Sequence, residues 1–378
     1  MKKIIGLYGI VLGLLCACSS SVDVCMTKSG LKAENFQTEA AGKPVGLYTL
    51  SNKNGMEVCL TNFGGRIVSV MVPDRQGVLQ DVVLGFDSIQ DYMKYSTDFG
   101  ASIGRYANRI KDGKITLEGK EIQLPRNNYG HCLHGGPKGW QYKVYDVLQA
   151  DSSSVVLSLD SPDGDENFPG NVKAMVKFCL EDDNSIHINY EAETDRTTII
   201  NMTNHSYFNL SGDASRDVLD NVLYLNADAF TPVDSTFMTT GEIRPVSGTP
   251  MDFRVPKAVG ASMDLSDEQV KNGNGYDHNW VLNTKGNLME VAAKLVSPHS
   301  GIALEVYTNE PGIQVYSGNF LDGSLKGKKG IVYNRRVAIC LETQHYPDSP
   351  NKPDWPGVVL SPGQKYESCC IYKFSVVR

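Results

Sequence analysis

The sequence predicts an all-β protein with few short helices, folded as a sandwich or a barrel. Apolar Ile186, Ile188 and Tyr190 alternate with polar residues, which is the period of a strand with one buried face. The polar stretch EDDNS at 181–185 joins this run to residues 173–180, so the two segments predict a β-hairpin. Helix signals are few along the whole chain, which favours strands throughout.

Further strands are expected where β-branched or aliphatic residues cluster. These runs lie at 115–117 and 121–124 around a turn at Gly119, and at 155–159, 301–308 and 337–341. Asp87 and Ser88 are weak helix-cap candidates, and SDEQ, which begins at Ser266, matches a capping box. No Pro-, Gly- or Ser-rich linker follows residue 40, so we expect one large domain over 40–378.

The N-terminus reads as a targeting signal. Two lysines precede an apolar run at 4–16 that is too short for a stable membrane anchor. The string LCAC at 15–18 resembles the bacterial lipobox, although Cys16 departs from the usual small residue. We expect a lipoprotein signal peptide over 1–17, acylation of Cys18, a tether over 18–39 and a place in the bacterial cell envelope, anchored to a membrane on the periplasmic side. An ordinary cleaved secretion signal is the alternative.

Composition excludes several classes of function. The formal net charge is -7 and no basic run is present, so we expect no nucleic-acid partner. The cysteines after Cys18 fit no zinc spacing, and the acidic turn DGDEN at 163–167 lacks the spacing of a calcium loop. We therefore expect no metal and no cofactor, and a monomer.

Two strings place a proton-transfer group inside a strand-like stretch. TNHSYFNL at 203–210 contains His205, and CLETQHYPD at 340–348 contains Glu342. A carboxylate in apolar surroundings is a stronger base than one in water, and an imidazole exchanges its proton near neutral pH. If both face one small molecule, they can move its protons without a cofactor.

Four other strings combine polar groups with strand-like flanks: GRYANRI at 104–110, LHGG at 133–136, GYDHNW at 275–280 and EPGIQVYSGN at 310–319. Arginine offers a planar fork of donors, and paired glycines allow close approach of the backbone. Asp277 could accept hydrogen bonds from two hydroxyls, and Gln314 on an apolar face needs a partner. Each string also has a structural interpretation: a surface salt bridge, a tight turn, an Asx-turn or a buried pair.

In their order and combination these strings closely resemble the aldose 1-epimerase (galactose mutarotase) family. The matching strings are NFG at 62–64, ANRI at 107–110, LHGG at 133–136, TNHSYFNL at 203–210, DHN at 277–279, EPGIQVY at 310–316 and LETQ at 341–344. The resemblance runs from about residue 40 to the C-terminus. It implies a large antiparallel β-sandwich of the galactose mutarotase type.

The resemblance also implies an activity and a set of residues. The family interconverts the α and β anomers of free aldoses such as glucose and galactose. Glu342 would be the base that takes the C1 hydroxyl proton, and His205 the acid that protonates the ring oxygen. The residues expected around the sugar are Asn108, Arg109, His134, Tyr207, Asp277 and Gln314.

Other functions remain open at this point. A non-catalytic glycan-binding lipoprotein would suit the sandwich and the lipid anchor. A glycoside hydrolase could use Asp277 and Glu342 as its carboxylate pair. A relative acting on hexose 6-phosphates would need several cations, and the matched strings hold only Arg105 and Arg109.

Overall fold

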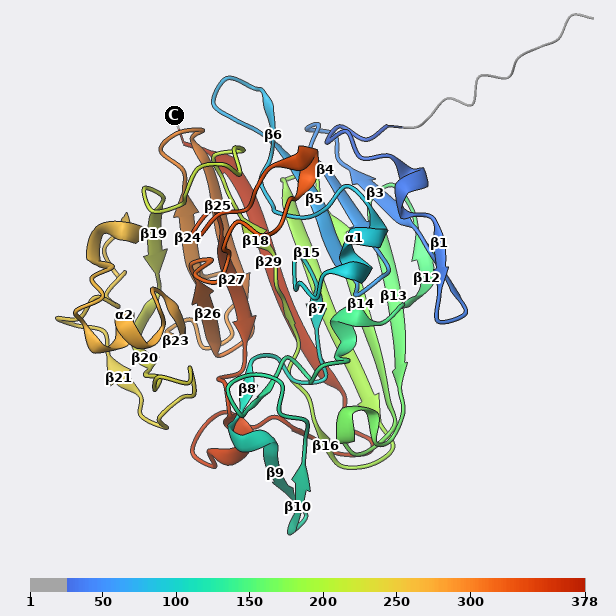
Figure 1. Ribbon diagram of the computed structural model, residues 1–378, viewed down its shortest axis with the longest axis vertical. Helices are drawn as coiled ribbons and strands as arrows, with labels where there is room; N and C mark the ends of the chain where they lie inside the picture. The colour runs from blue at the N-terminus through green and yellow to red at the C-terminus, as the bar shows by residue number, and fades with distance from the viewer. Residues whose placement is uncertain (1–25, 378) are drawn as a thin grey trace, which may run out of the picture.

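Antiparallel sheets make up the fold in the computed structural model, which describes residues 26–377 (Figure 1). The largest sheet has nine strands, with the long β29 near its centre. From edge to edge these strands are β12 (Asp146–Ala150), β13 (Ser154–Ser161), β14 (Val172–Leu180), β15 (Ser185–Thr194), β29 (Tyr366–Val376), β25 (Ile302–Thr308), β24 (Ala293–Val296), β19 (Val222–Leu225) and β22 (Lys257–Ala258).

Two smaller sheets pack against the nine-stranded sheet. One has six strands: β18 (Tyr207–Phe208), β27 (Ile339–Gln344), β26 (Gly312–Tyr316), β23 (Asp277–Leu282), β20 (Ala227–Thr231) and β21 (Arg244–Pro245). The other has four strands: β3 (Leu47–Ser51), β4 (Glu57–Thr61), β5 (Arg66–Pro73) and β6 (Leu79–Asp81). One buried apolar cluster holds side chains of all three sheets, so the expected antiparallel β-sandwich is confirmed.

Short elements complete the chain. The two-stranded sheets are β1 (Thr38–Ala40) with β2 (Lys43–Val45), β7 (Ser102–Ile103) with β17 (Thr203–Asn204), β8 (Arg109–Ile110) with β11 (Cys132–Leu133), β9 (Lys114–Leu117) with β10 (Lys120–Gln123), and β16 (Thr198–Ile199) with β28 (Val359–Leu360). The helices of the described residues are α1 (Ile89–Lys94), α2 (Glu268–Asn272) and seven 3₁₀ turns: η1 (Ala33–Phe36), η2 (Lys111–Gly113), η3 (Trp140–Tyr142), η4 (Asp165–Asn167), η5 (Val259–Ser262), η6 (Lys328–Gly330) and η7 (Ser349–Asn351).

Most predicted elements are present. The predicted hairpin is β14 and β15, whose register places Phe178 opposite Ile188. The turn at Gly119 joins β9 to β10, and the strands predicted at 155–159 and 301–308 lie within β13 and β25. The strand predicted at 337–341 begins later, at Ile339, because Arg336 has a positive φ of 66° in the preceding turn.

The helix caps agree with the sequence in one case and differ in the other. Ser88 caps α1, since its hydroxyl accepts the N–H of Asp91 at 3.3 Å. Helix α2 is capped by Asp267, whose carboxylate accepts the N–H of Val270 at 3.1 Å, and not by Ser266 as the capping-box match predicts. A carboxylate is at least as good a cap acceptor as a hydroxyl, so the helix begins one residue later.

The C-terminal part of the expected tether packs on the domain. Leu31 and Phe36 are fully buried in an apolar cluster, and the N–H of Lys28 donates to Glu57 at 2.7 Å. Their burial offsets the entropy of ordering a short polar segment, so the domain begins by residue 26 at the latest. The expected signal peptide over 1–17 and the acylated Cys18 lie outside the described residues.

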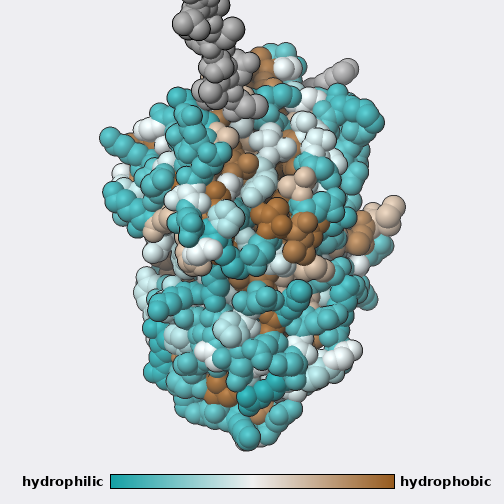
Figure 2. All heavy atoms as spheres, turned by 90° about the vertical axis from the view of Figure 1, so that its right-hand side faces the viewer, coloured by the Kyte–Doolittle hydropathy of each residue, from teal (hydrophilic) through white to brown (hydrophobic). Residues whose placement is uncertain are grey.

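The surface and the cysteines of the described residues bear on where the chain could work. The face on the right of Figure 1 is mainly hydrophilic and carries a small hydrophobic group (Figure 2). Among residues 26–377, no helix is both long and apolar enough to cross a bilayer. The cysteines of these residues are all unpaired thiols, of which Cys59, Cys132, Cys340 and Cys370 are buried.

Candidate active site

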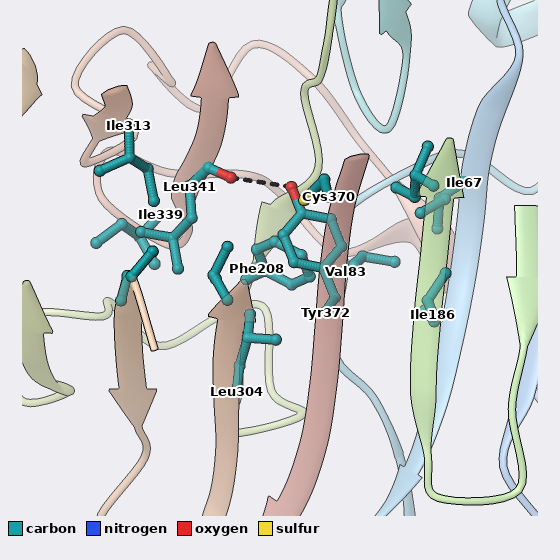
Figure 3. Close-up of a cluster of buried hydrophobic side chains, with 14 of the residues drawn as sticks. Ile67, Val83, Ile186, Phe208, Leu304, Ile313, Ile339, Leu341, Cys370 and Tyr372 are labelled. Atoms are coloured by element: carbon teal, nitrogen blue, oxygen red, sulfur yellow. Dashed lines mark hydrogen bonds between the residues drawn. The ribbon is translucent and has the colours of Figure 1, made fainter. Parts of the chain in front are cut away.

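Strand β27 has one face in the core and the opposite face in the candidate site. Ile339 and Leu341 lie in the core cluster, and the Tyr372 hydroxyl on β29 donates to the Leu341 carbonyl at 2.9 Å (Figure 3). Because successive side chains of a strand alternate, Glu342 lies on the opposite face. Its side chain is nevertheless 1 % exposed. The core contact therefore fixes the backbone directly beside this carboxylate.

The neighbouring strands add an amide and a second carboxylate to the same face. Gln314 on β26 lies opposite Glu342, and Asp277 opens β23 opposite Tyr316. The Gln314 Nε2 donates to Asp277 Oδ1 at 2.7 Å. Gln314 is buried and does not line the cavity described below, so its clearest contact orients Asp277.

His205 is held by its backbone and by an aromatic neighbour. Its N–H donates to the Ala101 carbonyl at 2.9 Å, and its carbonyl accepts the Gly100 N–H at 3.0 Å. Its ring stacks on Tyr207, with centroids 5.0 Å apart and planes 21° apart. The imidazole Nε2 lies 3.5 Å from Glu342 Oε1. The fold therefore brings together the two groups that the sequence predicts as acid and base.

The segments around β8 and β11 supply the hydrogen-bond donors. The backbone N–H of Asn108 donates to His134 Nδ1 at 3.1 Å, which places the proton of the neutral imidazole on Nε2. The Arg109 Nε donates to Asn128 at 3.0 Å, and its guanidinium lies 4.0 Å from Asp277. His134 and Arg109 thus enter the site as fixed donors.

Arg105, which belongs to the same string, is directed elsewhere. Its guanidinium is buried and donates to Ser161 Oγ at 2.6 Å and to the Pro169 carbonyl at 2.7 Å. It is therefore neither a surface salt bridge nor a site residue. Gly135 also serves the fold, because a Cβ there would lie 2.2 Å from the Gly104 carbonyl oxygen.

A cavity of ≈ 360 Å³ lies over this face, within the range of about 300–1,000 Å³ common for small-molecule sites. Its lining residues are Ser96, Asp98, Asn108, Arg109, Asn128, Tyr129, Leu133, His134, His205, Tyr207, Asp277, Tyr316, Phe320 and Glu342. All the predicted site residues except Gln314 and the lipidation site therefore meet in one cavity. Arg109 is the single Lys or Arg of this lining, which disfavours a phosphorylated sugar.

Several lining residues were not predicted from the sequence. Tyr316 shares a strand face with Gln314, two positions earlier, so the period of the strand could have revealed it. Asp98, Asn128, Tyr129 and Phe320 lie outside the named strands and helices, where no periodicity predicts the direction of a side chain.

Burial shifts the pKa values of the two central groups in opposite directions. Burial raises the pKa of Glu342 well above its usual value, and the nearby Asp277 and Asp98 raise it further while Arg109 opposes them. Burial lowers the pKa of His205. Starting from reference values of 4.5 and 6.5, these shifts move the two pKa values toward one another. Burial thus disfavours the charged form of each group.

Two buried polar atoms of this pair have no hydrogen-bond partner among residues 26–377. They are Glu342 Oε2 and His205 Nδ1. Buried polar atoms in folded proteins nearly always have a partner, so unpaired ones beside a cavity mark positions for a ligand.

The same region holds two groups of possible metal ligands, Asp98 with His134 and His205, and His205 with Cys340 and Glu342. Asp98, His134 and His205 offer atoms that lie within 4.8 Å of one another. A metal needs a lone pair from each imidazole, however, and the Nδ1 lone pair of His134 already accepts the Asn108 N–H. The remaining nitrogen of His134 carries the proton, so this group is better suited to donate a hydrogen bond.

Comparisons with known proteins show the family of this chain. The sequence model of the family described as aldose 1-epimerase matches residues 46–373. The galactose mutarotase of Rattus norvegicus is 43 % identical over 321 residues, which are 85 % of this chain and 92 % of that protein. The aldose 1-epimerase of Escherichia coli (strain K12) is 39 % identical over 335 residues, 88 % and 96 % of the two chains. The crystal structure of an aldose epimerase homologue from C. elegans superposes with a TM-score of 0.80 and 34 % identity, over 88 % of this chain and all of that one.

Proposed function

Because this chain belongs to the aldose 1-epimerase family, we propose that it interconverts the α and β anomers of aldoses with Glu342 as base and His205 as acid. The observation that carries the proposal is the pair itself. Its facing atoms lie 3.5 Å apart beside a cavity, and each side chain retains one unpaired buried polar atom. A sugar inserted here can hydrogen-bond to both groups.

The reaction proceeds by ring opening, a bond rotation and ring closure, with two proton transfers in opening and two in closure. Glu342 removes the proton of the C1 hydroxyl while His205 donates a proton to the ring oxygen. The bond between C1 and the ring oxygen breaks, and C1 becomes an aldehyde. After rotation about the C1–C2 bond, the ring closes on the other carbonyl face with both roles reversed. Each group must therefore both give and take a proton during one turnover.

The other predicted residues hold the sugar between these two groups. Asp277 accepts hydrogen bonds from neighbouring hydroxyls, while Arg109 and His134 donate from fixed positions. The side-chain oxygen of Asn108 accepts a hydrogen bond from the N–H of Arg109 at 2.9 Å. The side-chain nitrogen of Asn108 is therefore left to donate to the sugar. The set is completed by Tyr207, which packs on the His205 ring, and by Gln314, a positioning residue that orients Asp277.

The energetics require little more than this arrangement. The two anomers have similar free energies and interconvert slowly in water without a catalyst. Positioned acid and base groups each contribute about 10²–10⁴-fold in rate. A rigid hold on the substrate adds to this by lowering the entropy lost on the way to the transition state.

Polarimetry on freshly dissolved α-glucose and α-galactose tests this function. The enzyme should speed the approach to the equilibrium rotation, whereas Glu342→Gln and His205→Asn should lose most turnover with an unchanged circular dichroism spectrum. A near wild-type rate in either variant would reject the assignment. Sugar binding without any acceleration would instead support a non-catalytic glycan-binding protein. Xylose and arabinose in the same assay would define the preferred aldose.

We also propose that the chain is a lipoprotein of the bacterial cell envelope, acylated at Cys18 and held on the periplasmic side. The lipobox-like LCAC at 15–18 after a basic and apolar start supports this proposal. Labelling of growing cells with radioactive palmitate should mark the full chain and not a Cys18→Ala variant. Equal labelling of both, or of neither, would contradict it.

We propose further that the enzyme acts as a monomer, because Glu342, His205 and all but one of the expected sugar-binding residues already meet in a cavity of a single chain. Light scattering on the purified protein should give the mass of a single chain. A dimer that dissociates with loss of activity would contradict this.

A further inference from the structure

Three aromatic rings form a cluster at the mouth of the cavity. Tyr129 and Phe320 are 57 % and 47 % exposed and both line the cavity. The buried ring of Phe237 lies between them, with its centroid 5.2 Å from that of Tyr129 and 5.3 Å from that of Phe320. Tyr129 and Phe320 are the two exposed aromatic side chains among the large hydrophobic residues of the described chain, and they share one site.

This cluster is fixed by neighbours that belong to the active site. The Arg109 guanidinium lies over the Phe237 ring, 5.0 Å from its centroid. Phe320 is stacked on Tyr316 at 18°, and its N–H donates to the Tyr316 hydroxyl at 2.8 Å. The exposed faces of the rings are therefore held in place before any ligand arrives, which lowers the entropy lost on binding.

The depth of the cavity sets the direction of a bound sugar. Glu342 and His205 are 1 % and 5 % exposed and so lie at the floor, while the aromatic cluster lies at the mouth. The chemistry requires C1 and the ring oxygen at the floor. In a six-membered sugar ring, C4 and C3 lie across from C1 and the ring oxygen. These two carbons therefore point to the mouth, whereas the C6 group is attached beside the ring oxygen.

We propose that Tyr129 and Phe320 form a second sugar subsite, which stacks the non-reacting ring of a 4-linked reducing disaccharide whose reducing end occupies the cavity. Sugar rings have apolar faces that pack well on aromatic rings, and a substituent on O4 leaves the cavity toward this cluster. In a 6-linked disaccharide the second ring is attached through C6, on the side of the ring oxygen at the floor of the cavity. This second ring does not reach the aromatic cluster. This inference rests on the proposed function, because the orientation follows from the roles of Glu342 and His205.

Cellobiose and gentiobiose give a matched test, since both join two glucose units by a β-bond and differ only in the position of the link. We expect the wild-type enzyme to accelerate mutarotation of cellobiose well and of gentiobiose poorly, relative to glucose. In Tyr129→Ala with Phe320→Ala, the ratio of kcat/KM for cellobiose to that for glucose should fall about tenfold. Tyr129→Phe and Phe320→Tyr keep the rings and should keep the ratio.

The outcomes separate the subsite from the underlying activity. An enzyme that acts on glucose but not on cellobiose overturns the subsite, as does an equal loss for glucose and cellobiose in the alanine variant. Equal action on gentiobiose and cellobiose overturns the orientation. Absence of turnover with glucose itself would reject the proposed function, and the subsite with it.

Discussion

Residues 26–377 contain two glutamate–histidine pairs with buried carboxylates, on neighbouring parts of the fold, and the pairs differ in what surrounds them. In one, His205 Nε2 lies 3.5 Å from Glu342 Oε1. In the other, His345 Nδ1 lies 2.6 Å from Glu310 Oε2. Both glutamates are almost fully buried. The residue types alone therefore do not distinguish a catalytic pair from a structural one.

The difference lies in the remaining polar atoms. The second carboxylate oxygen of Glu310 is approached by the Tyr366 hydroxyl at 3.5 Å, so both oxygens of this side chain face a donor. By contrast, Glu342 Oε2 and His205 Nδ1 find no partner in the described part of the chain. A pair whose polar atoms are satisfied by the protein stabilises the fold, whereas an unsatisfied pair beside a cavity is available to a substrate.

The structural pair supports the catalytic one through the chain. His345 directly follows β27, which carries Glu342, and its N–H donates to Asn201 Oδ1 at 3.0 Å. Three residues further, the N–H of Asp348 donates to the Arg109 carbonyl at 2.8 Å. The Glu310–His345 pair thus fixes the segment that joins the base to a sugar-binding arginine.

The largest expected effect separates the two pairs by turnover. Glu342→Gln and His205→Asn each remove a group that moves a proton, so kcat should fall about 10²–10⁴-fold. Glu310→Gln is the matched control, because it makes the same chemical change in the pair that does not touch the sugar. It should retain kcat within about tenfold. Equal losses in Glu342→Gln and Glu310→Gln would break the distinction.

The next effect separates the pairs by stability. Glu310→Gln removes a charged partner of His345 inside the fold, and we expect a loss of about 2 kcal/mol in the free energy of unfolding. Urea denaturation of this variant and the wild type measures the loss. An unchanged midpoint would show that the 2.6 Å contact contributes nothing to the fold.

The pH profile sharpens the account of the catalytic pair. Productive enzyme needs Glu342 ionised and His205 protonated, so kcat/KM should fall on both sides of one maximum, approaching about tenfold per pH unit. Because the two groups lie 3.5 Å apart, the two limbs of the profile belong to the pair and not to either residue alone. A rate independent of pH between about 4 and 9 would contradict a catalytic role for these groups.

The smallest expected effect is an increase in the free energy of unfolding when Glu342 is replaced by glutamine. The pKa of Glu342 is raised by folding, so the folded state binds its proton more tightly than the unfolded state does. Stability from this group is therefore present at low pH and is lost as pH rises through the folded pKa. At neutral pH, Glu342→Gln should add about 1 kcal/mol to the free energy of unfolding. The gain should vanish near pH 4, and a variant less stable at neutral pH would contradict the sign.

The sequence predicts the strands for a simple physical reason, whereas the roles of the site residues follow from the resemblance to the aldose 1-epimerase family. A strand repeats every two residues, so the alternation of apolar and polar residues around Ile188 is sufficient to predict β15. Gln314 interrupts the apolar run of β26, and Glu342 follows the apolar start of β27 at residues 339–341, which marks both as polar groups in need of a partner.

Features outside the strands could not be predicted in this way. Arg105 and Arg109 lie four residues apart in one string, and no periodicity distinguishes them: the resemblance points to Arg109, which lines the cavity, while Arg105 donates to the Pro169 carbonyl. Asp98 reaches the site from a segment without regular structure. The packing of Leu31 is likewise a tertiary effect, because the small polar residues around it are typical of a linker.

The central claim is that Glu342 and His205 act as one unit on one sugar. A double-mutant cycle on the mutarotation rate of α-galactose tests it most directly. If the two groups work together, Glu342→Gln combined with His205→Asn should be about as slow as the slower single variant. Losses that multiply fully, so that the double variant is slower by the product of the two single losses, would mean that the groups act independently and would contradict the account.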